Sequence, residues 1–127
     1  MQEQDKYEYA VIRYVPRVER GEFINVGLAM MCKRRRWMRI RILLKTDCIG
    51  VMAPHTDFGA LGRQLQSFVD IADGNPDAGP VASFPVEERF RWITAVKSSI
   101  IQTSRPHPAL TDNLDSTFQR LFSELVE

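Results

Sequence analysis

The stretch YEYAVIRYV at residues 7–15, followed by RGEFINVG at residues 20–27, decides the fold expected for this chain. The first stretch is rich in β-branched and aromatic residues, which favour a β-strand. Pro16 ends that strand, because proline cannot donate to a strand ladder. Residues 16–21 then read as a hairpin connection, and residues 23–32 read as the second strand. The sequence therefore predicts an antiparallel hairpin at the start of a sheet.

A third strand is expected after the basic turn at residues 33–36, and it has the clearest alternation in the chain. In residues 37–45, apolar and basic side chains fall largely on opposite faces, as expected for a period of two. The basic face carries Trp37, Arg39, Arg41 and Lys45, with Leu43 as the exception. This pattern predicts an antiparallel meander with one apolar face and one basic face.

Helical spacing of apolar residues appears in later segments. Residues 58–72 predict a helix that lies across the apolar face of the sheet, with Thr56 or Asp57 as its cap. A shorter helix is expected from Pro85 to about Lys97, and a closing helix over residues 114–126. Helices would therefore cover the sheet mainly on one face.

The connecting segments set the limits of this architecture. Residues 46–54 read as an irregular link, residues 99–103 as an additional short strand, and residues 105–108 as a rigid loop between prolines. We expect residues 1–127 to form a single α+β domain. Its three- or four-stranded antiparallel sheet would begin with the N-terminal meander and pack against about three helices.

Composition narrows the classes of function. The chain has 127 residues, of which 44% are hydrophobic and 26% charged, and its net charge is only +1. The whole molecule therefore has no strong electrostatic bias, and any affinity for nucleic acid would need a local patch. The polar N-terminus is unlike a secretory signal, and no run reaches the length of a membrane span. With its isolated cysteines Cys32 and Cys48, the chain is expected to be cytoplasmic.

Unusual polar residues gather in the first hairpin. An arginine lies between two valines on the first strand, and an asparagine and Gly27 lie inside the second, where both types are disfavoured. Gly27 suggests a bulge or a close backbone approach. Local rules tend to fail at functional or strained sites. The candidate ligand or interaction residues are therefore Arg13, Arg17, Arg20, Glu22 and Asn25.

Two interpretations of this group stay open. The arginines could hold an anion through forked hydrogen bonds, and Glu22 could act as a base with Arg13 and Arg17, as in a small enzyme. Alternatively the group is structural, with Arg13 paired to Glu22 or Glu8 and Asn25 bonded to the turn backbone. Structural ion pairs are common enough to favour the second interpretation.

The basic run forms a second candidate surface. Its nucleic-acid or partner patch would consist of Arg34, Arg35, Arg36, Trp37, Arg39 and Arg41. Arginines there could contact phosphates while the indole stacks on a base. The same run also fits a solvated hairpin that protects a sheet edge, or a docking site for an acidic partner. Trp37 and Leu43 on this face are compatible with a homodimer as well.

Signatures of metal or cofactor binding are not found in the sequence. His55 and His107 have no second ligand at metal spacing. No P-loop, dinucleotide-binding glycine motif or nucleophile elbow occurs. We therefore expect no metal and no cofactor.

The opening residues 7–16 and 20–27 resemble those of DUF3037, a bacterial family of unknown function. Residues 98–102 and the closing segment 114–126 are also similar to that family, so the resemblance covers nearly the whole chain. The family offers no established activity. Its members are often encoded beside HipA-like kinases, which implies such a kinase as a protein partner. The leading hypothesis is a non-enzymatic accessory or interaction protein, with a nucleic-acid-binding module and a small enzyme as alternatives.

Overall fold

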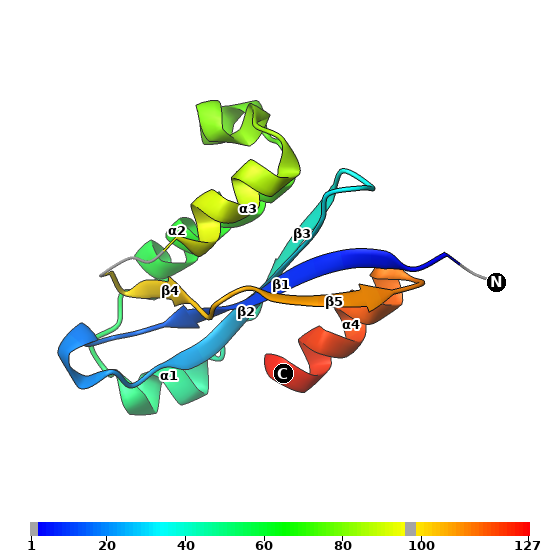
Figure 1. Ribbon diagram of the computed structural model, residues 1–127. Coiled ribbons are helices and arrows are strands. Elements are labelled where there is room, and N and C mark those ends of the chain that lie inside the picture. Colours follow the sequence, from blue (N-terminus) through cyan, green and yellow to red (C-terminus); the bar gives the residue numbers. More distant parts are fainter. Residues whose placement is uncertain (1–2, 96–98) are drawn as a thin grey trace.

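The centre of the molecule is a five-stranded antiparallel sheet, seen in a computed structural model that describes residues 3–95 and 99–127 (Figure 1). The strands are β1 (Asp5–Tyr14), β2 (Ile24–Cys32), β3 (Trp37–Ile42), β4 (Ile101–Thr103) and β5 (His107–Thr111). Their order is β3-β2-β1-β4, and β5 pairs with the first half of β1. The predicted α+β class and the N-terminal meander are confirmed, and the sheet gains a fifth strand.

Within the described part of the chain, four helices pack on this sheet. They are α1 (Thr46–Met52), α2 (Phe58–Ala72), α3 (Val86–Thr94) and α4 (Leu114–Leu125), with short 3-10 turns η1 (Val18–Arg20), η2 (Pro76–Ala78) and η3 (Pro80–Ser83). Asp57 caps α2 as predicted, since its carboxylate accepts a hydrogen bond from the Ala60 amide at 3.0 Å. The predicted end of the next helix near Lys97 lies outside the described residues. No helix in the described part of the chain is long and apolar enough to cross a bilayer.

Two segments differ from the sequence prediction. The expected irregular link contains α1, whose Ile49 is fully buried in the core. A helix with one buried residue is too short to show periodicity. The expected rigid loop after Arg105 instead opens into β5, where Pro108 pairs with Glu8. Proline is tolerated there because an edge strand leaves one side of its backbone unpaired.

One face of the sheet carries the larger apolar core, to which α1, α2 and α3 contribute. Its buried residues include Ile12, Val26, Ile40, Ile49, Leu65 and Phe90. The alternation of β1 and β3 directs these strand residues to the same side. This confirms the expectation that the helix at residues 58–72 covers the apolar face.

The opposite face, predicted to be basic and open, is covered by α4. Its buried residues include Tyr7, Leu28, Met30, Phe118, Phe122 and Val126. β2 is apolar on both of its faces, so it needs cover on both. The arginines of β3 fit into this arrangement because a guanidinium can stack on an aromatic ring. The expectation of a basic face is therefore wrong for the part of the sheet beneath α4.

Candidate functional site

A β-bulge divides the predicted hairpin group. Ile12 pairs with Gly27 but Arg13 pairs with Asn25, so Val26 is an extra residue in β2. A side chain at Gly27 would place its Cβ 2.7 Å from Ile42 Cδ1 and within 2.9 Å of a backbone oxygen of β3. The predictions of a bulge and of a close backbone approach are both confirmed.

Arg13 and Asn25 are partners across the β1–β2 pair, and Asn25 reaches the C-terminal end of α4. The Asn25 amide donates a hydrogen bond to the Leu125 carbonyl at 3.0 Å. The Arg13 guanidinium lies 4.2 Å from the centre of the Phe23 ring, and its Nε is buried without a hydrogen-bond partner. No ion pair among the described residues joins Arg13 to a carboxylate, so the predicted pairing with Glu22 or Glu8 is wrong. The amide does bond backbone, but that of α4 instead of the turn.

Arg17, Arg20 and Glu22 stay together in the loop between β1 and β2. Arg20 and Glu22 form an ion pair of 2.6 Å, and Arg17 forms one of 2.9 Å with Glu19. Both pairs are more than half exposed, so neither holds a charge in the core. Gly21 closes η1 with a φ of 71°, a conformation that glycine adopts without strain. The carboxylate proposed as a base is thus held by a neighbouring guanidinium.

These arginines border a depression that we call the loop hollow. It has a volume of about 370 Å³. Its lining residues are Tyr14, Pro16, Arg17, Arg20, Met52, Ala53, Pro54, His55 and Thr56. The β1–β2 loop therefore faces the segment that joins α1 to α2, and His55 lies beside the predicted arginines. Sequence alone could not show this neighbourhood, because the two segments are far apart along the chain.

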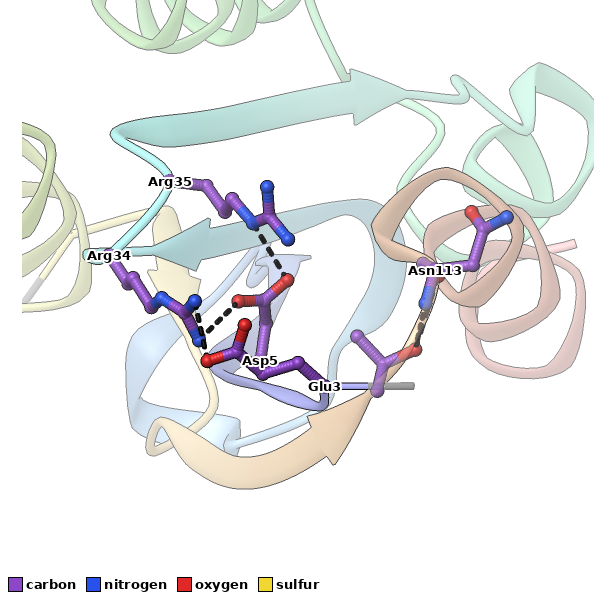
Figure 2. Close-up of polar contacts among 6 residues, drawn as sticks. Glu3, Asp5, Arg34, Arg35 and Asn113 are labelled. Atoms are coloured by element: carbon purple, nitrogen blue, oxygen red, sulfur yellow. Dashed lines mark hydrogen bonds and ion pairs between the residues drawn. The ribbon is translucent and has the colours of Figure 1, made fainter. Parts of the chain in front are cut away.

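The basic run is largely engaged in contacts within the fold. Figure 2 shows Arg34 and Arg35 turned toward acidic residues at the start of β1. Arg35 Nε donates to Asp5 at 2.9 Å, and Arg34 lies 2.6 Å from Glu3. Asp5 is only 5% exposed, so removing its cationic partner would leave a buried charge. The hydrogen bond from Arg34, followed by its charge, lowers the pKa of Glu3.

Three further predicted members of the patch, Trp37, Arg39 and Arg41, also have partners. Arg39 lies 5.0 Å from the Trp37 ring centre and 5.4 Å from that of Phe118, and it pairs with Asp115 at 2.7 Å. The guanidinium of Arg41 lies 4.4 Å from the ring centre of Phe122, also on α4. The indole and these two guanidinium groups therefore do not form an open stacking platform.

Arg36 points instead to a groove between the β2–β3 turn, β1 and α3, which we call the basic groove. Its volume is about 570 Å³. Its lining residues are Lys6, Tyr7, Glu8, Met31, Lys33, Arg34, Arg36, Glu87 and Arg91. A second hollow of about 570 Å³ continues past Phe84 and Pro85 and shares Lys33, Arg36 and Glu87 with it. Sequence reasoning missed the contributions of β1 and α3, since only the fold brings them beside the turn.

Charge is unevenly balanced along the basic groove. Among the described residues, Lys6, Lys33, Arg36 and Arg91 take part in no ion pair, whereas Arg34 is paired with Glu3. Two carboxylates, from Glu8 and Glu87, also line it. The groove therefore presents free cations with a minority of acidic groups.

Metal-binding chemistry has no visible basis in residues 3–95 and 99–127, where no group of three or more His, Cys, Asp and Glu could hold an ion. His107 lies 5.2 Å from the Tyr9 ring centre, as part of a tilted aromatic pair. His55 lines the loop hollow. The two histidines are thus placed in different parts of the molecule.

Comparison with known proteins identifies one family for this chain. No curated protein and no solved structure gives a significant match to this chain. The profile of one family, described as a protein of unknown function (DUF3037), matches residues 9–126. That match includes β2, β3 and all four helices, and it confirms the resemblance seen in the first hairpin. The chain belongs to the DUF3037 family.

Proposed function

We propose that this protein is a non-catalytic binding module that docks an acidic segment of another protein in the basic groove. The family resemblance makes a HipA-like kinase the first partner to test, in the cytoplasm. The observation that carries the proposal is the set of cations around one hollow that have no ion-pair partner within the described chain: Lys6, Lys33, Arg36 and Arg91.

The backbone at Arg36 supports a binding role for this groove. Its φ is 50°, the one positive value among the non-glycine residues that the structure describes. An L-residue in this region costs about 1–2 kcal/mol, and turns of this kind usually contain glycine or asparagine. An arginine here presents a charge at the turn in spite of that cost. Strain of this kind is typical of positions that serve a purpose other than stability.

A protein partner fits the groove better than nucleic acid does. Glu8 and Glu87 would repel a uniformly charged phosphate backbone, whereas an acidic peptide can also offer backbone N–H donors to these carboxylates. The indole of Trp37 and the guanidinium groups of Arg39 and Arg41 are already engaged with each other or with rings of α4. Arg34 and Arg35 already neutralise Glu3 and Asp5. Few cations therefore remain for the counterion release that drives nucleic-acid binding.

The proposal is tested with the double variant Arg36→Gly and Lys33→Glu. Glycine relieves the positive φ, so the variant should fold at least as well while losing charge at the groove. We expect binding of a fluorescent poly-glutamate peptide and of the purified HipA-like kinase, measured by anisotropy, to weaken at least about tenfold. Arg63→Glu, exposed on α2 and outside both hollows, is the matched control and should bind normally.

Other outcomes of this experiment would count against the proposal. Equal binding by the double variant and the wild type would remove the groove from the interface. Tighter, salt-sensitive binding of a single-stranded DNA oligonucleotide, lost in the double variant, would replace the protein partner with nucleic acid. Capture of the tagged protein's partners from lysate, with and without nuclease, would distinguish a natural protein partner from nucleic acid in the same way.

A further inference from the structure

The loop hollow lies at the other end of β2 from the basic groove, since β2 runs from the β1–β2 loop to the β2–β3 turn (Figure 1). Nothing in the proposed docking role uses it. At about 370 Å³ it falls within the size range of small-molecule sites and is small for a protein segment. The loop hollow is therefore a separate candidate site, of a size that suits a small molecule.

Hydrogen bonds fix both walls of the loop hollow. Thr56 Oγ1 donates a hydrogen bond of 2.8 Å to the Ala53 carbonyl. Because the Thr56 hydroxyl proton is used in that bond, the Tyr14 hydroxyl donates to Thr56 Oγ1, also at 2.8 Å. This bond ties the α1–α2 segment to β1. On the opposite wall, the Arg20 amide donates to the Arg17 carbonyl at 3.1 Å and closes η1. A site with walls held in place needs little ordering when a ligand enters.

Two arginines and a histidine are among the residues that line the loop hollow. Arg17 contacts Glu19 through Nε, and Arg20 contacts Glu22 through Nε and one terminal nitrogen. A guanidinium has five N–H donors, so each arginine keeps donors that these glutamates do not use. Exposed ion pairs of this kind contribute little and are easily rearranged. An incoming oxyanion can therefore bind both arginines, and His55 adds a third donor.

The remaining wall is apolar. Pro16, Met52 and Pro54 line the hollow beside the cations. Small-molecule sites combine such surfaces with a few polar groups that fix orientation. A methionine adapts to ligands of different outline, because its side chain is flexible. The ligand should therefore carry one anionic end and one compact apolar end.

We propose that the loop hollow binds a small organic oxyanion, a carboxylate or phosphate monoester attached to a compact apolar group. Arg17 and Arg20 bind the anionic oxygens, and His55 donates a further hydrogen bond. Met52 and the two prolines contact the apolar part. This site is independent of the basic groove, so the failure of one proposal leaves the other standing.

Three probes that share a ring test the proposal: phenyl phosphate, benzoate and benzyl alcohol. Each is titrated into the isotope-labelled full chain at about 150 mM salt, where long-range attraction is screened. We expect one or both anions to shift the NMR signals of Arg17 Nε–Hε, Arg20 Nε–Hε and His55, with benzyl alcohol at least about tenfold weaker. The stronger anion tells phosphate from carboxylate.

Variants locate the binding. Arg17→Gln and Arg20→Gln should each weaken the stronger anion roughly tenfold, since each removes a charge-assisted contact. Arg63→Gln, exposed on α2, should leave it unchanged. The substituted side chains are exposed, so circular dichroism should show an intact fold. Equal binding of benzyl alcohol, signal shifts spread over the whole surface, or unchanged binding in both hollow variants would each overturn the proposal.

Discussion

On the face covered by α1, α2 and α3, the sheet presents mainly aliphatic side chains, whereas on the face covered by α4 two arginines of β3 lie over aromatic rings. Both faces are dry at their centres, with Phe90 and Phe118 each 2% exposed. The two faces differ at the edges of their cores, where the α4 side has arginine side chains. On the α4 face the guanidinium groups of Arg39 and Arg41 lie over the Phe118 and Phe122 rings, 5.4 and 4.4 Å from the ring centres. A basic alternation along a strand thus does not show that a face is open.

The largest loss of stability is expected when the aromatic ring at the centre of either core is removed. Phe90→Ala and Phe118→Ala should each lower the free energy of unfolding by about 3–5 kcal/mol, because each leaves a cavity in a packed core. β1 and β2 carry residues of both cores, so both variants should still unfold in one transition. Urea unfolding followed by circular dichroism and tryptophan fluorescence measures this.

The same experiment also tests whether the core beneath α4 folds together with the rest of the sheet. If Phe118→Ala unfolds in two steps, with α4 released before the sheet, the second face is an independent layer that the rest of the fold does not need. Hydrogen exchange would then show early loss of protection in residues 114–125 alone. A single transition with probes that coincide would instead show that the two cores form one cooperative unit.

A smaller loss of stability is expected when one of the arginines beside the α4 core is replaced. Arg41→Gln keeps most of the stem but removes the charge over the Phe122 ring, so the free energy of unfolding should fall by roughly 0.5–1 kcal/mol. Arg63→Gln, exposed on α2, should change it by less. Combining Arg41→Gln with Phe122→Leu isolates the pair, since the two losses should be less than additive if the ring and the charge interact. Strict additivity would show that Arg41 is only a solvated residue.

Much of this fold could be predicted from the sequence, and the reason is physical. β1, β2 and β3 are rich in β-branched and apolar residues and follow one another closely, so local pattern and pairing agree. The apolar spacing of α2 and α4 is equally local. α1 and β5 cannot be read from the sequence because α1 has a single buried anchor, Ile49, and β5 contains Pro108. Which face α4 covers depends on the apolar residues of β2, which point both ways.

The candidate sites were less predictable, because they depend on distant neighbours. Arg17, Arg20 and Glu22 can be grouped from the sequence alone, because they are close together along the chain in the β1–β2 loop. Arg13 does not belong with them, because the bulge beside Gly27 pairs it with Asn25, which contacts α4. The basic groove needed Lys6 from β1 and Arg91 from α3, which no local pattern joins to the β2–β3 turn.

The smallest effect concerns a buried hydroxyl on the α4 face and appears only at alkaline pH. Tyr7 is 4% exposed, and burial raises the pKa of its phenol, with Tyr9 acting in the same direction and Arg120 opposing. The folded state therefore favours the neutral phenol. Its contribution to stability is fully present below the unfolded pKa of about 10 and is lost as pH rises through the folded pKa. Tyr7→Phe should remove this dependence.

Urea unfolding of the wild type and of Tyr7→Phe between pH 8 and 11, compared pH by pH, isolates this one group from the other titrating residues. The wild type should lose stability more steeply than Tyr7→Phe as the pH rises. Parallel curves would mean that water reaches the Tyr7 hydroxyl. Since Tyr7 packs in the core beneath α4, such a result would place the edge of that core deeper than the packing indicates.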